Sequence, residues 1–268
     1  MKKIVGYGLL TVFILIFGFS LPVQAGDNIL IAAASNLRFA MHEICRDFQE
    51  ENSSIQTKVS YGSSGNFFAQ ISQGAPFDIF FSADATYPEL LEKEGLTAKE
   101  TQKVYAVGKI VLWFPKNSKV DPDKWVQAVT STDVKKLAIA NPRHAPYGRA
   151  AEESLRYYGL WEKVEGKLIY GENISQTAQF VHTGVADAGI VALSLAISSK
   201  MLHEGRYWVI PDESHSDIEQ IYVVLKKGEG KKSIRKLLDF IHGERGGNIL
   251  SRYGFVIPSV RSVGDNRS

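Results

Sequence analysis

Residues 60–84 have the sequence SYGSSGNFFAQISQGAPFDIFFSAD, and an alternating apolar run at residues 55–61 predicts a strand that leads into it. Residues 66–73 then have the apolar periodicity of a helix, and residues 78–81 that of a short buried strand. Strand, small-residue loop, helix and strand in this order form a βαβ-type unit. Its helix begins with unpaired backbone N–H groups at the positive end of the helix dipole, and such a helix start attracts anions.

Ser63 and Ser64 lie directly before this helix, and two roles are open to them. A serine in this position usually caps the helix, because its oxygen accepts a hydrogen bond from a backbone N–H group. The same hydroxyls can instead donate hydrogen bonds to an anion held at the helix start. This loop alone favours capping, and further loops of the same kind would favour binding.

Three further strand ends lead into helix starts. A buried strand predicted at residues 28–34 leads into Ser35 and Asn36, and two later strands lead into helices predicted at residues 149–158 and 176–183. Ligands of open α/β sheets collect at the carboxyl ends of the strands. We therefore expect these loops to point at one ligand site.

Residues 1–25 have the pattern of a secretion signal. Two lysines precede an apolar run at residues 4–21, and Val23-Gln24-Ala25 has the small-x-small form of a signal-peptidase site. The alternative is a membrane anchor, because the apolar run is just long enough to span a bilayer. Pro22 and the small residues after it favour cleavage, so we expect an exported, soluble chain that begins at Gly26.

Composition limits the classes of function. The chain has 268 residues and a formal net charge of +2, which includes the lysines of the expected signal. The remainder is close to neutral, which argues against a nucleic-acid-binding protein. The single cysteine, Cys45, has no partner for an internal disulfide and is expected to be a buried thiol. The six histidines are scattered without the spacing of metal ligands.

The length of the chain suits one large domain or two lobes. Residues 103–114 have one long apolar pattern, interrupted at Gly108, and predict a strand that crosses between two lobes.

A hydrolytic enzyme is the alternative from another class of function, with Ser64, Asp84, His144 and Asp187 as the available groups. However, Gly62-Ser63-Ser64-Gly65 is one residue too short for the Gly-x-Ser-x-Gly nucleophile elbow. Asp84 follows a strand and is expected to cap the next helix or to fix its loop. A catalytic assignment needs both motif and geometry, so no catalytic residue is predicted. A sensor or adhesion module is a further alternative.

Four segments resemble the periplasmic molybdate-binding proteins of ABC transporters. They are AAASN at 32–36, YGSSGNFFAQISQGAPFDIFFSAD at 61–84, NPRHAPYGRAAEESL at 141–155 and GENISQTAQFVHTGVADAGIVALS at 171–194. The resemblance runs over nearly all of the expected mature chain. Tungstate-binding proteins and the wider sulfate- and phosphate-binding proteins share the fold of that family but fit these motifs less well.

The resemblance implies an α/β protein with the type II periplasmic-binding-protein fold, in which two lobes enclose a ligand cleft. Residues 26–107 plus 218–268 would form lobe one, and residues 108–217 would form lobe two. The implied protein works in the periplasm as a monomer without a cofactor. Its partner would be an ABC transporter permease in the membrane, and it would have no catalytic activity.

The same resemblance implies six residues that bind the oxyanion: Ser35, Asn36, Ser63, Ser64, Tyr147 and Ile174. The hydroxyls of Ser35 and Ser64 would be the main side-chain donors, with Ser63 in support. Tyr147 and Ile174 would act through their backbone N–H groups.

One position departs from the pattern of the family. Some members have a ligand-binding Tyr where this chain has Ala192, which places the chain nearer the subgroup in which Asn36 and Tyr147 contribute instead. None of the four loops has Lys or Arg at its donor positions. Molybdate is fully deprotonated at neutral pH and only accepts hydrogen bonds, so it suits such loops, whereas protonated phosphate does not. Molybdate and tungstate are the expected ligands, with sulfate, or tungstate as the main ligand, as the alternatives.

Overall fold

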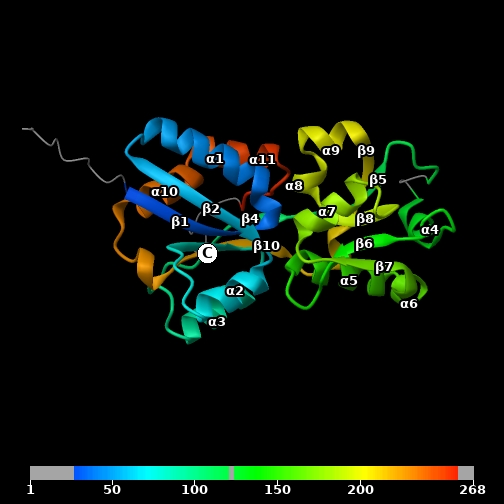
Figure 1. The fold of residues 1–268 in the computed structure, drawn as a ribbon, viewed down its shortest axis with the longest axis horizontal. Coiled ribbons are helices and arrows are strands. Elements are labelled where there is room, and N and C mark those ends of the chain that lie inside the picture. The colour runs from blue at the N-terminus through cyan, green and yellow to red at the C-terminus, as the bar shows by residue number, and fades with distance from the viewer. Residues whose placement is uncertain (1–26, 121–123, 259–268) are drawn as a thin grey trace, which may run out of the picture.

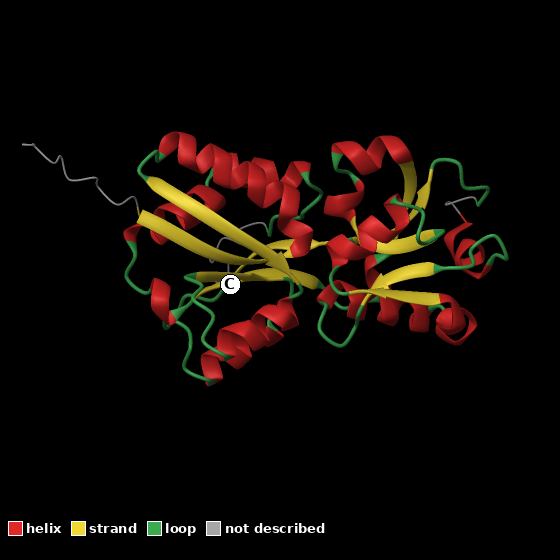
Figure 2. Ribbon diagram, in the orientation of Figure 1, coloured by secondary structure: helices red, strands yellow, loops and turns green. Residues whose placement is uncertain are grey.

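The computed structural model describes residues 27–120 and 124–258, which form two α/β lobes side by side (Figure 1, Figure 2). Each lobe is built on one five-stranded sheet. The expected secretion signal at residues 1–25 lies outside the described residues.

The sheet of lobe one has the strand order β2-β1-β3-β10-β4. Its strands are β1 (Asp27–Ala34), β2 (Ile55–Gly62), β3 (Ile79–Ser82), β4 (Lys103–Gly108) and β10 (Ile218–Val224). β1 pairs in parallel with β2 and β3, whereas β10 runs antiparallel to β3 and β4. One face is covered by α1 (Arg38–Glu51), α10 (Lys232–His242) and α11 (Glu244–Arg252), and the other by α2 (Ser64–Ser72) and α3 (Thr86–Lys93).

The sheet of lobe two repeats this plan in the order β7-β6-β8-β5-β9. Its strands are β5 (Ile110–Pro115), β6 (Leu137–Ala140), β7 (Leu168–Gly171), β8 (Ala188–Ala192) and β9 (Gly205–Val209). β6 is parallel to β7 and β8, and β5 is antiparallel to β8 and β9. The helices are α4 (Trp125–Thr130), α5 (Pro146–Tyr157), α6 (Trp161–Val164), α7 (Ile174–His182), α8 (Leu193–Ala196) and α9 (Ser199–Glu204).

Short 3-10 turns complete both lobes: η1 (Ser35–Leu37), η3 (Glu165–Lys167), η4 (Asp212–Ser214) and η5 (Lys226–Gly228). Among the described residues, no helix is long and apolar enough to cross a membrane.

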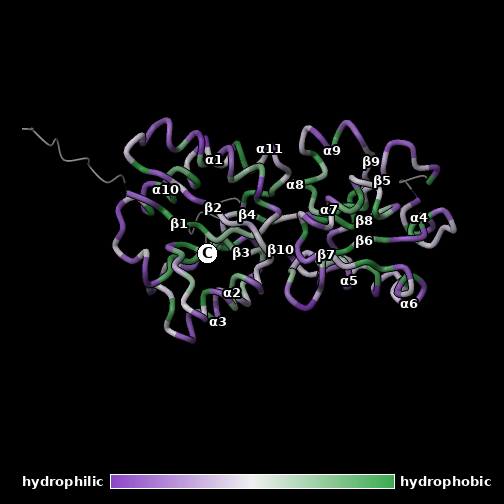
Figure 3. The backbone as a smooth tube through the Cα atoms, viewed as in Figure 1, coloured by the Kyte–Doolittle hydropathy of each residue, from purple (hydrophilic) through white to green (hydrophobic). Residues whose placement is uncertain are grey.

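Each sheet has a hydrophobic core of its own. In lobe one, Ile44 and Phe48 of α1 are buried together with Phe81 of β3. In lobe two, Trp113 and Phe114 of β5 are buried in a separate cluster. Apolar residues concentrate along the strands, and polar residues on the outer helices and loops (Figure 3). Full burial of one large apolar side chain contributes about 1.5–3 kcal/mol, so each lobe has its own source of stability.

The chain crosses between the sheets at two places. The long strand predicted at residues 103–114 is in fact two strands, because β4 ends at Gly108 in one sheet and β5 begins at Ile110 in the other. The second crossing lies between β9, which ends at Val209, and β10, which begins at Ile218. The lobe division expected at 107/108 and 217/218 stays a prediction, and β4 extends the first sheet to Gly108.

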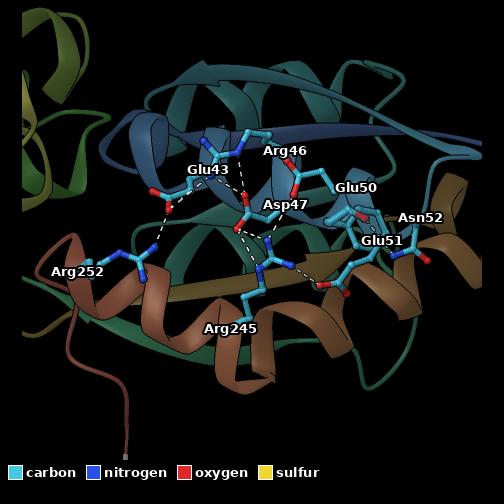
Figure 4. A network of polar contacts seen from close by, with 9 residues as sticks. Glu43, Arg46, Asp47, Glu50, Glu51, Asn52, Arg245 and Arg252 are labelled. Carbon is cyan, nitrogen blue, oxygen red and sulfur yellow. Dashed lines mark hydrogen bonds and ion pairs between the residues drawn. The ribbon is translucent and has the colours of Figure 1, made fainter.

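Ion pairs fasten α11 to α1 on the surface of lobe one (Figure 4). Arg245 lies 2.9 Å from Asp47 Oδ2 and 2.6 Å from Glu51 Oε1. Arg252 lies 2.6 Å from Glu43 Oε1. Exposed pairs contribute at most about 1 kcal/mol each. Asp47 is buried, however, so its carboxylate depends on these partners.

The helices at the strand ends begin earlier than the sequence pattern predicts. α2 begins at Ser64 rather than at residue 66, α5 at Pro146 rather than at 149, and α7 at Ile174 rather than at 176. Ser64, Tyr147 and Ile174 therefore lie in the first turns of these helices, where backbone N–H groups have no partner within the helix.

Candidate functional site

A small cavity lies where the loops of the two sheets meet. All six residues that the sequence implied for ligand binding line this cavity: Ser35, Asn36, Ser63, Ser64, Tyr147 and Ile174. About 10 Å³ is open to the centre of a water-sized sphere, which is about the space that one water molecule needs. Small residues, among them Ala34, Ala83 and Ala145, complete the wall and bring the backbone close to its contents.

Ser35 connects the two lobes at this cavity. It follows β1 and begins the 3-10 turn η1. Its hydroxyl accepts a hydrogen bond from the N–H of Ser175 at 3.2 Å and donates one to Asn173 Oδ1 at 3.1 Å. Both partners lie at the start of α7 in lobe two, so Ser35 contacts the opposite lobe directly.

Ser63 and Ser64 make different contacts within the protein. Ser63 is the N-cap of α2, since its oxygen accepts a hydrogen bond from the N–H of Asn66 at 3.4 Å. Ser64 is fully buried, and its oxygen accepts the N–H of Ala83 at 3.0 Å. The hydroxyl proton of Ser64 has no acceptor among the described residues and remains available to a ligand.

Three helix starts present backbone donors at the cavity. Within the described part of the chain, the N–H groups of Ser64, Tyr147 and Ile174 donate to no protein acceptor. Pro146 precedes Tyr147 at the first position of α5, where its missing N–H is not needed. Asn173 caps α7, because its Oδ1 accepts the N–H of Gln176 at 3.1 Å. Helix dipoles add positive potential at these positions without a charged residue.

The side chain of Tyr147 is engaged in a buried polar network. Its hydroxyl accepts a hydrogen bond from Asn36 Nδ2 at 3.1 Å, and the same amide donates to Gln220 Oε1 at 2.8 Å. Burial raises the pKa of the Tyr147 hydroxyl, and hydrogen bonds to Asn36 and Gln220 oppose part of that rise. The structure therefore leaves Tyr147 its backbone N–H as the group available to a ligand.

Among the residues that the structure describes, no Lys or Arg lines the cavity. The guanidinium of Arg149, in the first turn of α5, pairs with Asp84 across the lobes and donates to Tyr87 at 3.3 Å. Asp84 also accepts the N–H of Tyr87 at 3.4 Å, as a residue that fixes its loop would. The cavity is thus rich in neutral donors and poor in formal charge.

The proposed enzymatic groups do not form a catalytic constellation. His144 contacts Ser63 rather than Ser64, and Asp187 accepts the N–H groups of Lys135 and Lys136 at 2.8 Å. Cys45 is buried, and burial raises the pKa of its thiol to about 11, which keeps it unreactive. In the part of the chain that the structure describes, no group of three His, Cys, Asp or Glu residues could hold a metal ion.

Residues that sequence reasoning did not assign to the site also surround it. Asn173 had a recognisable signal, since Asn is a preferred N-cap before a helical pattern. Gln220 had one too, as a polar residue within an apolar run, and the structure buries it fully in β10. His144 and Glu172 had no such signal in the sequence, because only the approach of the two lobes brings them to Ser63 and Asn66.

A larger groove, of about 600 Å³, lies beside the start of α1 and includes Arg38, His182 and Lys200. It is open to solvent and contains charges, in contrast to the closed cavity. It shares the start of α7 with the small cavity, because Asn173 and Ser175 also line the groove.

Two α/β lobes that enclose a donor-rich cavity define a solute-binding protein. The family model of the bacterial extracellular solute-binding proteins matches residues 29–256. The chain belongs to this family. The α/β two-lobed fold expected from the sequence is therefore confirmed.

Among known proteins, the chain is similar to two proteins named molybdate-binding protein ModA. The one from Rhodobacter capsulatus is 39% identical over 246 residues, which cover 92% of this chain and 94% of that protein. The one from Azotobacter vinelandii is 39% identical over 232 residues, covering 87% and 90%. The solved structure of the Azotobacter vinelandii periplasmic molybdate-binding protein has a TM-score of 0.81 at 29% identity, and the match covers 86% of this chain and 100% of that one. The resemblance to molybdate-binding proteins inferred from the motifs is confirmed.

Proposed function

We propose that this protein captures molybdate, and also tungstate, in the periplasm and delivers the anion to an ABC permease in the membrane. The relatives with 39% identity and the structural neighbour are all named as molybdate-binding proteins. Export would follow removal of residues 1–25, and the protein would act as a monomer. It would release its ligand unchanged, without catalysis and without a resident cofactor.

One observation carries this proposal: a closed cavity lined by hydroxyl and N–H donors and by no charged residue. The ligand MoO4²⁻ carries no proton at neutral pH, so each of its oxygens can only accept hydrogen bonds. Hydrogen bonds to a charged acceptor are roughly twice as strong as neutral ones, so several of them suffice without a salt bridge. Phosphate carries a proton at neutral pH, and its O–H group is not stabilised by the hydroxyl and N–H donors; Asn36 Oδ1 is the buried oxygen of the wall without a hydrogen-bond partner among the described residues.

Six residues would hold the anion. Ser35 and Ser64 would donate from their hydroxyls, and Tyr147 and Ile174 from their backbone N–H groups. Asn36 would contribute beside Ser35, and Ser63 would support Ser64. Because Ala192 replaces the Tyr of some relatives, no fifth contact would come from a hydroxyl on β8.

A calorimetric titration of the chain from Gly26 onward tests this function. We expect tight binding of molybdate and tungstate, and much weaker binding of sulfate and phosphate. A neutral donor set does not itself reject sulfate, so the size of the cavity must provide that part of the selection. Equal affinities for sulfate and molybdate would contradict the proposal.

A further inference from the structure

Four side chains form a cluster between the lobes beside the cavity: Ser63, Asn66, His144 and Glu172. Ser63 Oγ of lobe one lies 3.0 Å from His144 Nδ1 of lobe two. Asn66 Nδ2 of lobe one donates to Glu172 Oε1 of lobe two at 2.8 Å. His144 Nε2 lies 3.6 Å from the same Glu172 oxygen. We call these four residues the interlobe cluster.

The backbone brings the two loops of this cluster into direct contact. The N–H of Gly65 donates to the carbonyl oxygen of His144 at 2.9 Å. A Cβ atom at Gly65 would lie 2.8 Å from that oxygen, so a side chain at this position would push the loops apart. The contact between Ser63 and His144 is therefore part of a close approach of the two lobes.

The carboxylate of Glu172 favours one tautomer of the neutral His144 imidazole. A carboxylate attracts an N–H group, and Glu172 Oε1 lies 3.6 Å from Nε2, so we assign the proton to Nε2. Nδ1 is then an acceptor and receives the hydroxyl proton of Ser63. The oxygen of Ser63 already accepts the N–H of Asn66 at 3.4 Å. The one proton of Ser63 is thus used on His144, and Ser64 is left as the hydroxyl donor of this loop.

We propose that His144 and Glu172 are positioning residues of the anion site, which hold the lobes closed over the ligand without touching it. The inference rests on the proposed function. Because both side-chain hydrogen bonds of the cluster cross from one lobe to the other, they are lost when the lobes separate. They therefore stabilise the closed, ligand-bound state and slow release of the anion, whereas capture by the open form does not depend on them.

Stopped-flow fluorescence with molybdate separates these two rates. His144→Ala should raise the dissociation rate constant about tenfold and change the association rate constant by less than about twofold, as the loss of one or two net hydrogen bonds implies. His144→Asn places an amide oxygen near the position of Nδ1, where it can accept the Ser63 proton. We expect this variant to restore most of the slow release, which mere loss of packing would not allow.

Glu172→Ala provides a second test with little risk to folding, because this side chain is 61% exposed. It removes the acceptor of Asn66 and the group that orients His144, so release should again be faster by about tenfold. The matched control is His182→Ala. His182 Nε2 lies 2.6 Å from Glu204 Oε2, but both residues belong to lobe two, so the rate of release should not change.

The outcomes distinguish the two proposals. If wild-type protein binds molybdate and both His144→Ala and Glu172→Ala release it at the wild-type rate, the role of the interlobe cluster is overturned while the function stands. A slower association with unchanged release would also overturn it. If the wild-type protein does not bind molybdate, the proposed function fails and the role of the cluster fails with it.

Discussion

At the scale of single residues, Ser64 shows how one hydroxyl can serve both the fold and the ligand. Its oxygen accepts the N–H of Ala83 at 3.0 Å, and its proton is left for the cavity. The Ser35 hydroxyl is instead engaged with lobe two. Its oxygen accepts the N–H of Ser175 at 3.2 Å, and it donates its proton to Asn173 Oδ1 at 3.1 Å. A ligand must compete with Asn173 for the Ser35 proton, whereas the Ser64 proton needs no such exchange.

Ser64→Ala should therefore lower the affinity for molybdate more than any other single hydroxyl deletion. We expect a loss of about 1.5–3 kcal/mol, or roughly ten- to hundredfold in Kd, measured by calorimetry. The buried N–H of Ala83 also loses its acceptor, so the free energy of unfolding should fall by about 1–3 kcal/mol. Ser72→Ala, at the exposed end of the same helix, is the control and should bind as wild type. Wild-type affinity in Ser64→Ala would remove Ser64 from the site.

The sequence was informative about residues wherever a motif identified a loop. It placed six residues that the structure brings to one cavity. The helical pattern could not show which of the two serines caps the helix, because the N-cap depends on where the helix begins and α2 begins at Ser64. Nor could the sequence predict that the hydroxyl of Tyr147 would be hydrogen-bonded in a network with Asn36 and Gln220, since these three residues meet only in the tertiary structure.

At the scale of elements, the crossing strand and the start of α5 fit tightly against each other. Gly108 ends β4, and a Cβ atom there would collide with the hydroxyl of Tyr147. Tyr147 belongs to lobe two, so the absence of a side chain at Gly108 allows the lobes to approach. This explains why the long apolar pattern at residues 103–114 is interrupted where it is.

Gly108→Ala should disfavour the closed arrangement and raise the Kd for molybdate about tenfold, in line with an overpacking cost of about 1–3 kcal/mol. Tyr147→Phe removes the colliding hydroxyl but keeps the backbone N–H. The double variant should therefore bind more tightly than Gly108→Ala alone. Fluorescence titration of the three variants gives the comparison, and equal affinities of the single Gly108 variant and the double variant would exclude this steric account.

The contact between α1 and α11 leads to a prediction about pH. Burial raises the pKa of Asp47, but hydrogen bonds and charges of Arg46 and Arg245 outweigh this and hold it below the usual value. The pKa of Asp47 is lower in the folded state than in the unfolded state, where it is near 3.9. The charged carboxylate therefore stabilises the fold at pH values above 3.9, and this stabilisation is lost as the pH falls through the folded-state pKa. Asp47→Asn should lower the free energy of unfolding, measured with urea, by about 1–3 kcal/mol at pH 7 and by much less at pH 3.

The control, Glu50→Gln, removes an exposed partner of Arg245, and its effect on the free energy of unfolding should stay within about 0.5 kcal/mol. An equal loss at both pH values in Asp47→Asn would show that the charge is not responsible.

Most of the elements could be predicted from apolar periodicity, because β1, β3, β6 and β8 are buried runs and α1 and α10 have one apolar face. The limits of the helices could not be predicted in this way. The first turns of α2, α5 and α7 contain small or polar residues and a proline. The residue at which each of these helices begins depends on its cap and on contacts with the other lobe. The split of the crossing strand likewise depends on which sheet offers a partner on each side of Lys109.

At the scale of the whole molecule, the donors at the cavity come from both lobes. Ser35 and Ser64 follow strands of lobe one, and Tyr147 and Ile174 begin helices of lobe two. An anion that contacts all four must hold the lobes together. Under the proposed function, the anion favours this closed shape, and a membrane permease could recognise it as the signal that the protein is loaded.

The location of the bound anion tests this account most directly. Crystals of the chain from Gly26 onward, grown with molybdate at a low multiple of its Kd, should give one molybdenum anomalous peak in the cavity. Its oxygens should lie within hydrogen-bond distance of the hydroxyls of Ser35 and Ser64 and of the N–H groups of Tyr147 and Ile174. A peak in the open groove near Arg38 and Lys200, or one that contacts a single lobe, would contradict the central claim.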